Sequence, residues 1–295
     1  MAAKRSCSVA LALLVTAGHA WGQGRGVPGS VVFFSARDGN NEIYAMDWDG
    51  RRPLRITSDP ASDTDPDISP NGRDIVFTSS RTGNNDIFVV GSTGGTPINL
   101  TNNAANDGWA RWAPDGEHIV FHSNRDGNFE LYVMNRDGTD VVRLTNYPGV
   151  DQYPDWSPDG QEIAFRRDVD IYVMRVSTGE VRRLTDAPPL NQMPAWSPNG
   201  KQLAFMSQRA GYISVWLMNA DGSNPVNLTP KNPGDLDSDW VSRAPSWSTT
   251  GRQIYFMSLR PSTGLDVEVF IMNSDGSGVV RLTNSVGMDG SPRSR

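Results

Sequence analysis

The sequence repeats one short pattern six times. An apolar segment ends in an aliphatic residue followed by threonine, at intervals of 44, 44, 40, 44 and 54 residues. The six pairs are Ile56-Thr57, Leu100-Thr101, Leu144-Thr145, Leu184-Thr185, Leu228-Thr229 and Leu282-Thr283. Self-similarity at a period of about 44 residues indicates one supersecondary unit copied side by side. Residues that recur in every copy therefore serve the unit, and departures from the repeat are the first places to look for function.

The third copy shows that the unit contains four strands. His118 to Ser123 alternates between two sets of side chains, which is the period of a strand. Tight turns and further strand-like segments surround it, namely Trp109 to Trp112, Pro114-Asp-Gly116, Asp126-Gly127, Leu131 to Asn135, Asp137-Gly138 and Val141 to Leu144. Four antiparallel strands in about 40 to 45 residues are typical of a propeller blade. The sequence predicts an all-β, six-bladed β-propeller of four-stranded antiparallel blades.

The first copy begins at Val31 and has no innermost strand ahead of it. Asp289-Gly-Ser-Pro292 lies at the same offset after Thr283 as Asp151-Gln-Tyr-Pro154 does after Thr145. We therefore expect the C-terminal segment to join blade one as its inner strand and to close the ring. Because only Pro292 to Arg295 remain for that strand, the closing strand is expected to be short.

Residues 1–22 have the composition of an export signal. Lys4 and Arg5 precede the uncharged run Val9–Ala17. The small residues Gly18 and Ala20, or Ala20 and Gly22, fit a cleavage site. The run is too short to span a bilayer. Cleavage would leave a propeller of residues 23–295 that contains no cysteine, because the chain's single cysteine belongs to the signal. We expect this domain in the periplasm or outside the cell.

Charge limits the classes of partner. Removal of Lys4 and Arg5 with the signal leaves 25 basic residues against 33 acidic residues, a net charge of −8. This balance argues against nucleic acid and anionic membranes as partners. We expect no membrane insertion and a monomeric protein.

Several copies resemble a known family. The relevant segments are Ser35-Ala-Arg-Asp-Gly-Asn-Asn-Glu-Ile-Tyr-Ala-Met46, Ser123-Asn-Arg-Asp-Gly-Asn-Phe-Glu-Leu-Tyr-Val-Met134 and Asp155-Trp-Ser-Pro-Asp-Gly160. They resemble the repeats of TolB-type β-propellers, and the resemblance extends from Val31 to Pro292. It covers the propeller half of that family and not its N-terminal α/β domain. The resemblance implies a protein-interaction module of the bacterial cell envelope, with envelope proteins as partners and a peptidoglycan-associated lipoprotein among the candidates.

Two residue types recur in a way that fits the scaffold. An arginine follows the second strand of most copies, at Arg37, Arg81, Arg125, Arg209 and Arg260. We expect these arginines to pair across the hairpin with Glu42, Asp86, Glu130 and Glu268 and so to fix its register. Tryptophans recur on the inner strand at Trp112, Trp156, Trp196 and Trp247. We expect them to pack between blades, where large aromatic side chains contribute buried area.

A second recurring position is a candidate binding site. One short polar residue lies three positions before each inner-strand proline or alanine. These residues are Asp63, Asp107, Asp151, Asn191, Ser242 and Asp289. We expect these residues on the connections that meet at one mouth of the channel. They would cap their own turns, or form an acidic collar that attracts a cation such as calcium or a basic segment of a partner.

The connection between blades five and six is the longest departure from the repeat. Thr229 to Pro245 spans 16 residues where the other connections span nine, and the insertion carries Asp235, Asp237, Asp239, Trp240 and Arg243. We interpret these residues as candidate binding residues, because long loops in compact domains are often functional. A calcium loop of the EF-hand type is excluded, because it would need glycine at the position of Trp240 and glutamate at that of Ser246. A looser calcium site and an ordinary solvated loop remain alternatives.

Enzymatic motifs are missing from the sequence. It has no Gly-x-Ser-x-Gly elbow and no glycine-rich phosphate loop. His118 and His122 lie four residues apart on one strand, about 13 Å apart, which is too far to chelate one ion. We therefore expect no catalytic residue, no metal ligand and no cofactor. The alternative is a ligand- or metal-binding propeller with lyase- or hydrolase-type activity at the channel mouth.

Overall fold

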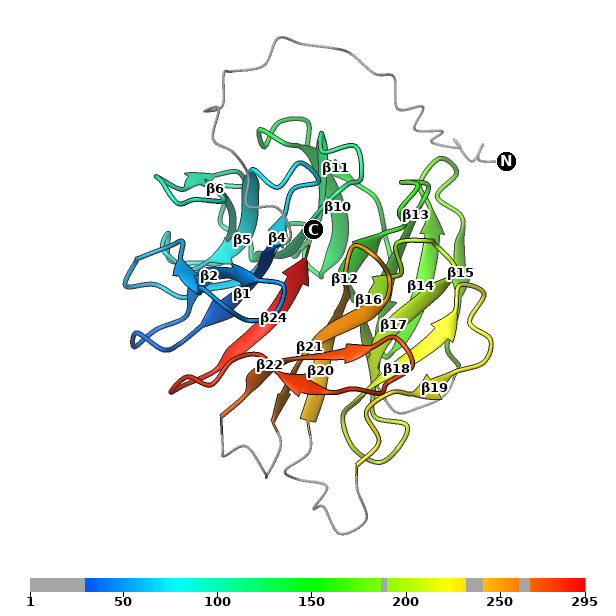
Figure 1. Ribbon diagram of the computed structural model, residues 1–295. Helices are drawn as coiled ribbons and strands as arrows, with labels where there is room; N and C mark the ends of the chain where they lie inside the picture. The colour runs from blue at the N-terminus through cyan, green and yellow to red at the C-terminus, as the bar shows by residue number, and fades with distance from the viewer. Residues whose placement is uncertain (1–29, 187–189, 232–240, 260–265, 295) are drawn as a thin grey trace, which may run out of the picture.

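The computed structural model describes residues 30–186, 190–231, 241–259 and 266–294. These residues form six sheets of four antiparallel strands that follow one another around a central axis (Figure 1). The predicted all-β, six-bladed propeller is therefore confirmed. The described ranges are folded without helices, so none of their segments is a helix that could cross a membrane.

Each blade contributes one strand to each of four concentric layers. The innermost strands are β4 (Asp63–Ile68), β8 (Asp107–Trp112), β12 (Asp151–Trp156), β16 (Asn191–Trp196), β20 (Val241–Trp247) and β24 (Asp289–Ser294). The second strands are β1 (Ser30–Ser35), β5 (Asp74–Ser79), β9 (His118–Ser123), β13 (Glu162–Arg167), β17 (Gln202–Ser207) and β21 (Gln253–Leu259). The third strands are β2 (Glu42–Asp47), β6 (Asp86–Gly91), β10 (Glu130–Asn135), β14 (Asp170–Arg175), β18 (Ser214–Asn219) and β22 (Glu268–Asn273). The outermost strands are β3 (Leu54–Arg55), β7 (Ile98–Asn99), β11 (Val142–Arg143), β15 (Val181–Arg183), β19 (Val226–Asn227) and β23 (Val280–Arg281).

The core lies between the blades. In β9, Ile119 and Phe121 pack toward blade two, whereas Val120 packs toward blade four. Alternate side chains of a strand point to opposite faces, so a blade with two neighbours is apolar on both. The inner-strand tryptophans belong to these clusters as predicted: Trp112, for example, is 1% exposed and packs with Val76 of the preceding blade.

The repeated threonine joins the outermost strand to the third strand. The hydroxyl of Thr145 accepts the backbone N–H of Leu131 at 2.9 Å and donates to the buried carboxylate of Glu130 at 2.6 Å. Equivalent hydroxyls accept third-strand amides in the other blades, at Thr57, Thr101, Thr185, Thr229 and Thr283. The hydroxyl therefore pairs a backbone donor beyond the end of a two- or three-residue strand, which explains why threonine recurs in every copy.

The C-terminal strand closes the ring. β24, red in Figure 1, lies beside the blue β1 and pairs with it antiparallel, with Ser35 opposite Asp289 and Val31 opposite Ser294. The expectation that the C-terminal segment joins blade one is confirmed. The strand begins at Asp289 and has six residues, as most of the other inner strands do, so it is longer than predicted.

Every inner strand contains a bulge at the same place. The third residue of the repeat on this strand has a positive φ, between 47° and 57°, at Asp65, Trp109, Tyr153, Met193, Ala244 and Ser291. Pairing with the second strand shifts register at this point. A left-handed conformation is unfavourable for bulky residues, so its occurrence in all six blades indicates that the fold requires it. The bulge bends the strand where it lines the channel.

Candidate functional site

The predicted collar residues begin the inner strands at one end of the ring. Asp63, Asp107, Asp151, Asn191 and Asp289 are the first residues of their strands, and Ser242 is the second residue of β20. They lie on the strands themselves and not on the preceding connections, and each is at most 1% exposed. Their side chains are thus covered by neighbouring residues.

Arginines from the adjacent hairpins pair with the buried acids. The ion pairs are Arg81–Asp63 at 2.7 Å, Arg125–Asp107 at 3.1 Å, Arg167–Asp151 at 2.7 Å and Arg37–Asp289 at 3.0 Å. In blade five, Arg209 donates to the amide oxygen of Asn191 at 3.1 Å. In blade four the hairpin is shortened to Asp168 and Val169, and Arg167 pairs from the strand itself.

The expected pairing of these arginines across the hairpin was wrong. Arg125 lies over the rings of Phe121 and Tyr132, which direct its guanidinium toward the inner strand. Glu130 pairs instead with Arg143 of the outermost strand. Glu42 and Glu268 likewise pair with Arg55 and Arg281, Asp86 accepts hydrogen bonds from Thr82, Asn99 and Thr101, and Arg260 lies outside the described residues.

Burial dominates the protonation equilibrium of two collar acids. It raises the pKa of Asp63 and of Asp151, although hydrogen bonds from Arg81 and Arg167 act in the opposite direction. A carboxylate removed from water loses hydration that one ion pair does not fully replace.

A cavity of about 200 Å³ opens beside these pairs. Its walls include Asp65, Trp109, Phe129, Tyr153 and Met193. The exposed amides of Asn85 and Asn106 stand at its edge. Aromatic walls with a few polar groups are typical of a recognition pocket.

His122 is part of this cavity. Its ring makes edge contacts with Phe129 and Tyr153, at centroid distances of 5.2 and 5.7 Å. Burial, together with Arg166 and Arg111, lowers the pKa of His122 to about 3. The imidazole is therefore neutral at physiological pH. His118 makes a separate contact, 2.8 Å from Asp115.

The predicted binding loop is only partly described. Asp235, Asp237, Asp239 and Trp240 lie outside the described residues. Arg243 is in β20, opposite Met257 of β21.

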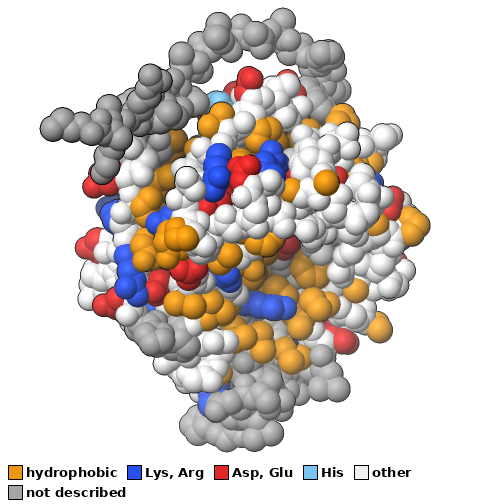
Figure 2. Space-filling model, turned by 180° about the vertical axis from the view of Figure 1, so that it is seen from behind, with side chains coloured by type: hydrophobic (Ala, Val, Ile, Leu, Met, Phe, Trp, Pro, Cys, Tyr) orange, Lys and Arg blue, Asp and Glu red, His pale blue; other side chains and the backbone are white. Residues whose placement is uncertain are grey.

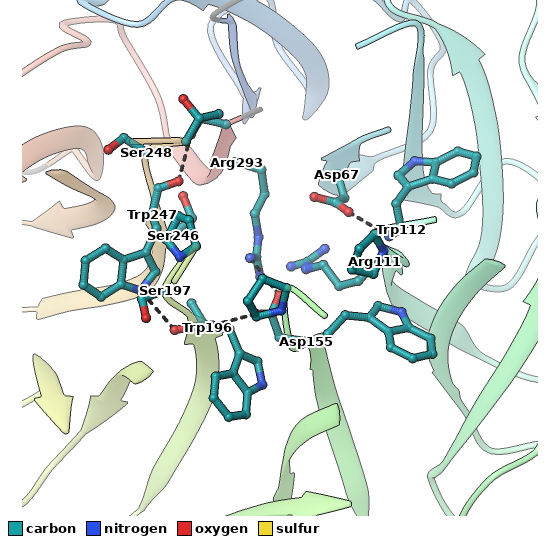
Figure 3. A pocket seen from close by; sticks show the side chains of 17 residues that line it. Asp67, Arg111, Trp112, Asp155, Trp196, Ser197, Ser246, Trp247, Ser248 and Arg293 are labelled. Atoms are coloured by element: carbon teal, nitrogen blue, oxygen red, sulfur yellow. Dashed lines mark hydrogen bonds and ion pairs between the residues drawn. The ribbon is translucent and has the colours of Figure 1, made fainter. Parts of the chain in front are cut away.

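A second cavity, of about 240 Å³, lies at the opposite end of the channel. The four inner-strand tryptophans and the prolines of the following turns form part of its wall, with Asp67, Arg111, Asp155 and Arg293 (Figure 3). These four charged residues occupy one equivalent position on four inner strands. Asp67 accepts the backbone N–H of Trp112, and Asp155 accepts that of Trp196, both at 2.8 Å. Each acid thus links its blade to the next one.

The two cavities are separated by packed side chains. Trp109 meets Tyr153 edge to face at 4.8 Å, and both pack with Met193 and Ala244 from the next two blades. Among the described residues, none lines both cavities. Across the residues that the structure covers, His, Cys, Asp and Glu form no group of three suited to hold a metal ion.

The sequence matches models of two propeller families. The Tricorn protease N-terminal beta propeller domain matches residues 27–130, and the TolB beta propeller domain matches residues 100–170 and 146–243. A curated relative, the Tol-Pal system protein TolB of Geobacter sulfurreducens, is 45% identical over 47 residues, which is 16% of this chain and 11% of that protein. The chain is a TolB-type β-propeller.

Solved structures agree on the fold of this TolB-type propeller. A putative TolB from Agrobacterium tumefaciens is 23% identical, with a TM-score of 0.69 over 90% of this chain and 96% of that one. TolB from Acinetobacter baumannii is also 23% identical, with a TM-score of 0.75 over 90% of this chain and 66% of that one. The chain thus corresponds to about two thirds of the latter protein.

Sequence reasoning identified one end of this TolB-type propeller and overlooked the other. The collar was visible because its residues recur. The position of Asp67, Arg111, Asp155 and Arg293 alternates between acid and base, and is Ala195 and Ser246 in blades five and six. That departure from the repeat could have identified the second cavity.

Proposed function

We propose that this TolB-type propeller is exported to the periplasm and binds an envelope protein at the collar end of its channel. The aromatic cavity beside the buried collar carries the proposal. A peptidoglycan-associated lipoprotein is the first candidate partner, because the curated relative is named as part of a Tol-Pal system. The composition of residues 1–22, which is typical of an export signal, supports the location.

The chemistry of the collar end suits recognition of a polypeptide. Phe129 and Tyr153 are only half-buried, so an inserted apolar side chain would cover them further. Asn85 and Asn106 offer donors and acceptors to a peptide backbone at the rim. Figure 2 shows acidic and basic side chains interspersed on one face of the molecule, so that face carries no uniform field of one sign.

Direct titration tests this proposal. The propeller is titrated by calorimetry with the soluble domain of the peptidoglycan-associated lipoprotein from the same organism. Phe129→Ala should weaken binding by about 2 kcal/mol or more, roughly thirtyfold, if Phe129 is a hot spot. Trp48→Ala is the matched control, because Trp48 is 56% exposed and is not part of either cavity wall.

Two results would contradict the proposal. One is the absence of binding to this lipoprotein and to any protein captured from the envelope. The other is equal affinity of the Phe129→Ala and wild-type proteins when circular dichroism shows that both are folded.

A further inference from the structure

Arg111 is a buried cation with unused hydrogen-bond donors. It is 2% exposed and lines the cavity opposite the collar. Its Nη1 donates to the carbonyl of Ala110 at 2.7 Å, whereas Nε and Nη2 have no hydrogen-bond partner among the described residues. An unpaired buried donor is costly, and more so when it is charged. A bound group that accepts hydrogen bonds from Nε and Nη2 would remove this cost.

The unused donors form the edge of a guanidinium that suits a carboxylate. Nε and Nη2 point in parallel and match the two oxygens of one carboxyl group. The same edge of Arg167 holds Asp151 at 2.8 and 2.7 Å. That of Arg52 holds Asp47 at 2.8 and 3.0 Å. Arg111 thus carries a fork that this chain elsewhere fills with its own acids.

The acids that interact electrostatically with Arg111 form hydrogen bonds to other groups. Asp67 accepts the backbone N–H of Trp112, and Asp155 accepts that of Trp196. Asp155 also accepts Arg293 at 3.2 Å. Asp65 accepts the hydroxyl of Ser291 at 2.9 Å. They offset part of the positive charge without bonding the fork.

A second cation faces the same space. In Figure 3 the side chains of Arg111 and Arg293 extend from different strands toward the middle of the cavity. Burial and the charge of Arg293 lower the pKa of Arg111 to about 9. An anion between the two guanidiniums would relieve both their repulsion and the loss of hydration.

The cavity has room for more than an ion. Its volume of about 240 Å³ exceeds that of an apolar cavity of about 150 Å³ that holds benzene. The indole N–H groups of Trp112, Trp156 and Trp196, which also line it, have no hydrogen-bond partner in the described part of the chain. The wall therefore combines aromatic surface with two guanidinium groups.

We propose that this end of the channel binds a carboxylate group, held by the Nε/Nη2 edge of Arg111 and by Arg293. The carboxylate belongs to a small organic acid or to the C-terminus of a short peptide. This site is independent of the envelope-protein interface proposed at the collar end.

The wild-type protein provides the first test. Sodium acetate and sodium succinate are titrated into it in Tris chloride buffer at constant ionic strength, and tryptophan fluorescence and the thermal midpoint are recorded. A saturable fluorescence change and a raised midpoint are expected below about 10 mM for at least one acid, because a ligand that binds only the folded state stabilises it. Acetamide should have no effect. No saturable response to either acid, or an equal response to acetamide or to inorganic phosphate, would overturn the proposal.

Peptides distinguish the two sources of the carboxylate. Trialanine with a free C-terminus is compared with trialanine amide. Tighter binding of free trialanine than of succinate assigns the site to peptide ends, and the reverse order assigns it to small acids. Equal binding of the free and amidated peptides contradicts recognition of a carboxylate.

Variants tie the response to the proposed residues. Arg111→Lys keeps the charge and removes the fork, so affinity should fall by about tenfold or more. Arg293→Gln should weaken binding as well, and it serves if the buried Arg111→Lys variant does not fold. The matched control is Arg252→Gln, which changes an exposed arginine on a neighbouring turn. Unchanged affinity in folded Arg111→Lys, or in Arg293→Gln, would refute the assignment.

Discussion

Replacement of Asp151 separates the charge of a collar acid from its hydrogen bonding. Asp151 is fully buried and binds Arg167 through two hydrogen bonds, and the arginine side chain is only 16% exposed. Asp151→Ala would leave that cation without its partner. Removing one member of a buried ion pair costs about 3–5 kcal/mol. For a domain of this size the thermal midpoint should fall by roughly 10 °C.

Asp151→Asn should be far milder, and blade five shows why. There the chain itself has Asn191, whose oxygen accepts Arg209 at 3.1 Å. Loss of one charge-assisted hydrogen bond costs about 1.5–3 kcal/mol, but the amide avoids the cost of burying a carboxylate. We expect a net loss of about 1 kcal/mol.

Urea unfolding followed by far-ultraviolet circular dichroism measures both variants. Two substitutions at one position are compared, so most unfolded-state effects are shared. If Asp151→Asn loses as much stability as Asp151→Ala, the negative charge is required and the comparison with blade five does not hold.

Three other expectations follow from the same structure. Burial raises the pKa of Asp151 in the folded protein, so the protonated carboxyl contributes stability that is fully present below the unfolded pKa of about 3.9 and is lost as pH rises through the higher folded pKa. Asp151→Asn should therefore reduce the fall of the unfolding free energy with rising pH, and an unchanged pH dependence would contradict this expectation. Deletion of Met288–Arg295 should lower the thermal midpoint, because it exposes the edge of the first blade; an unchanged midpoint would argue against ring closure by this strand. Combined replacement of Asp237, Asp239 and Trp240 by alanine should preserve the melting curve and weaken partner binding by about 2 kcal/mol, and unaltered affinity would show that the loop is solvated surface.

The fold could be predicted because its determinants are local and repeated. Threonine recurs at the position of Thr145 in every copy, because a hydroxyl there pairs with a third-strand backbone amide. The closing strand was predictable from the offset of Asp289 after Thr283 alone. Six copies of one pattern leave little freedom in the arrangement.

The partners of the charged residues could not be predicted. The spacing predicts that Arg125 pairs with Glu130, because both lie on one hairpin, but packing over Phe121 and Tyr132 directs its guanidinium to Asp107. Sequence spacing predicts which residues are neighbours on a hairpin. It does not predict which aromatic rings a long side chain packs over, and therefore which acid it reaches. The role of Arg111 likewise depends on residues from several blades, which only the closed ring brings together.

The packed layer formed by Trp109, Tyr153 and Met193 separates the two ends of the channel. Side chains from three blades pack across the middle of the channel, so the channel consists of two separate cavities that open at opposite ends. Ligands bound in the two cavities would contact different residues, and any coupling between them would have to pass through the packed side chains of this layer. The two ends can therefore acquire different partners through independent substitutions, while the positive-φ backbone positions between them stay unchanged.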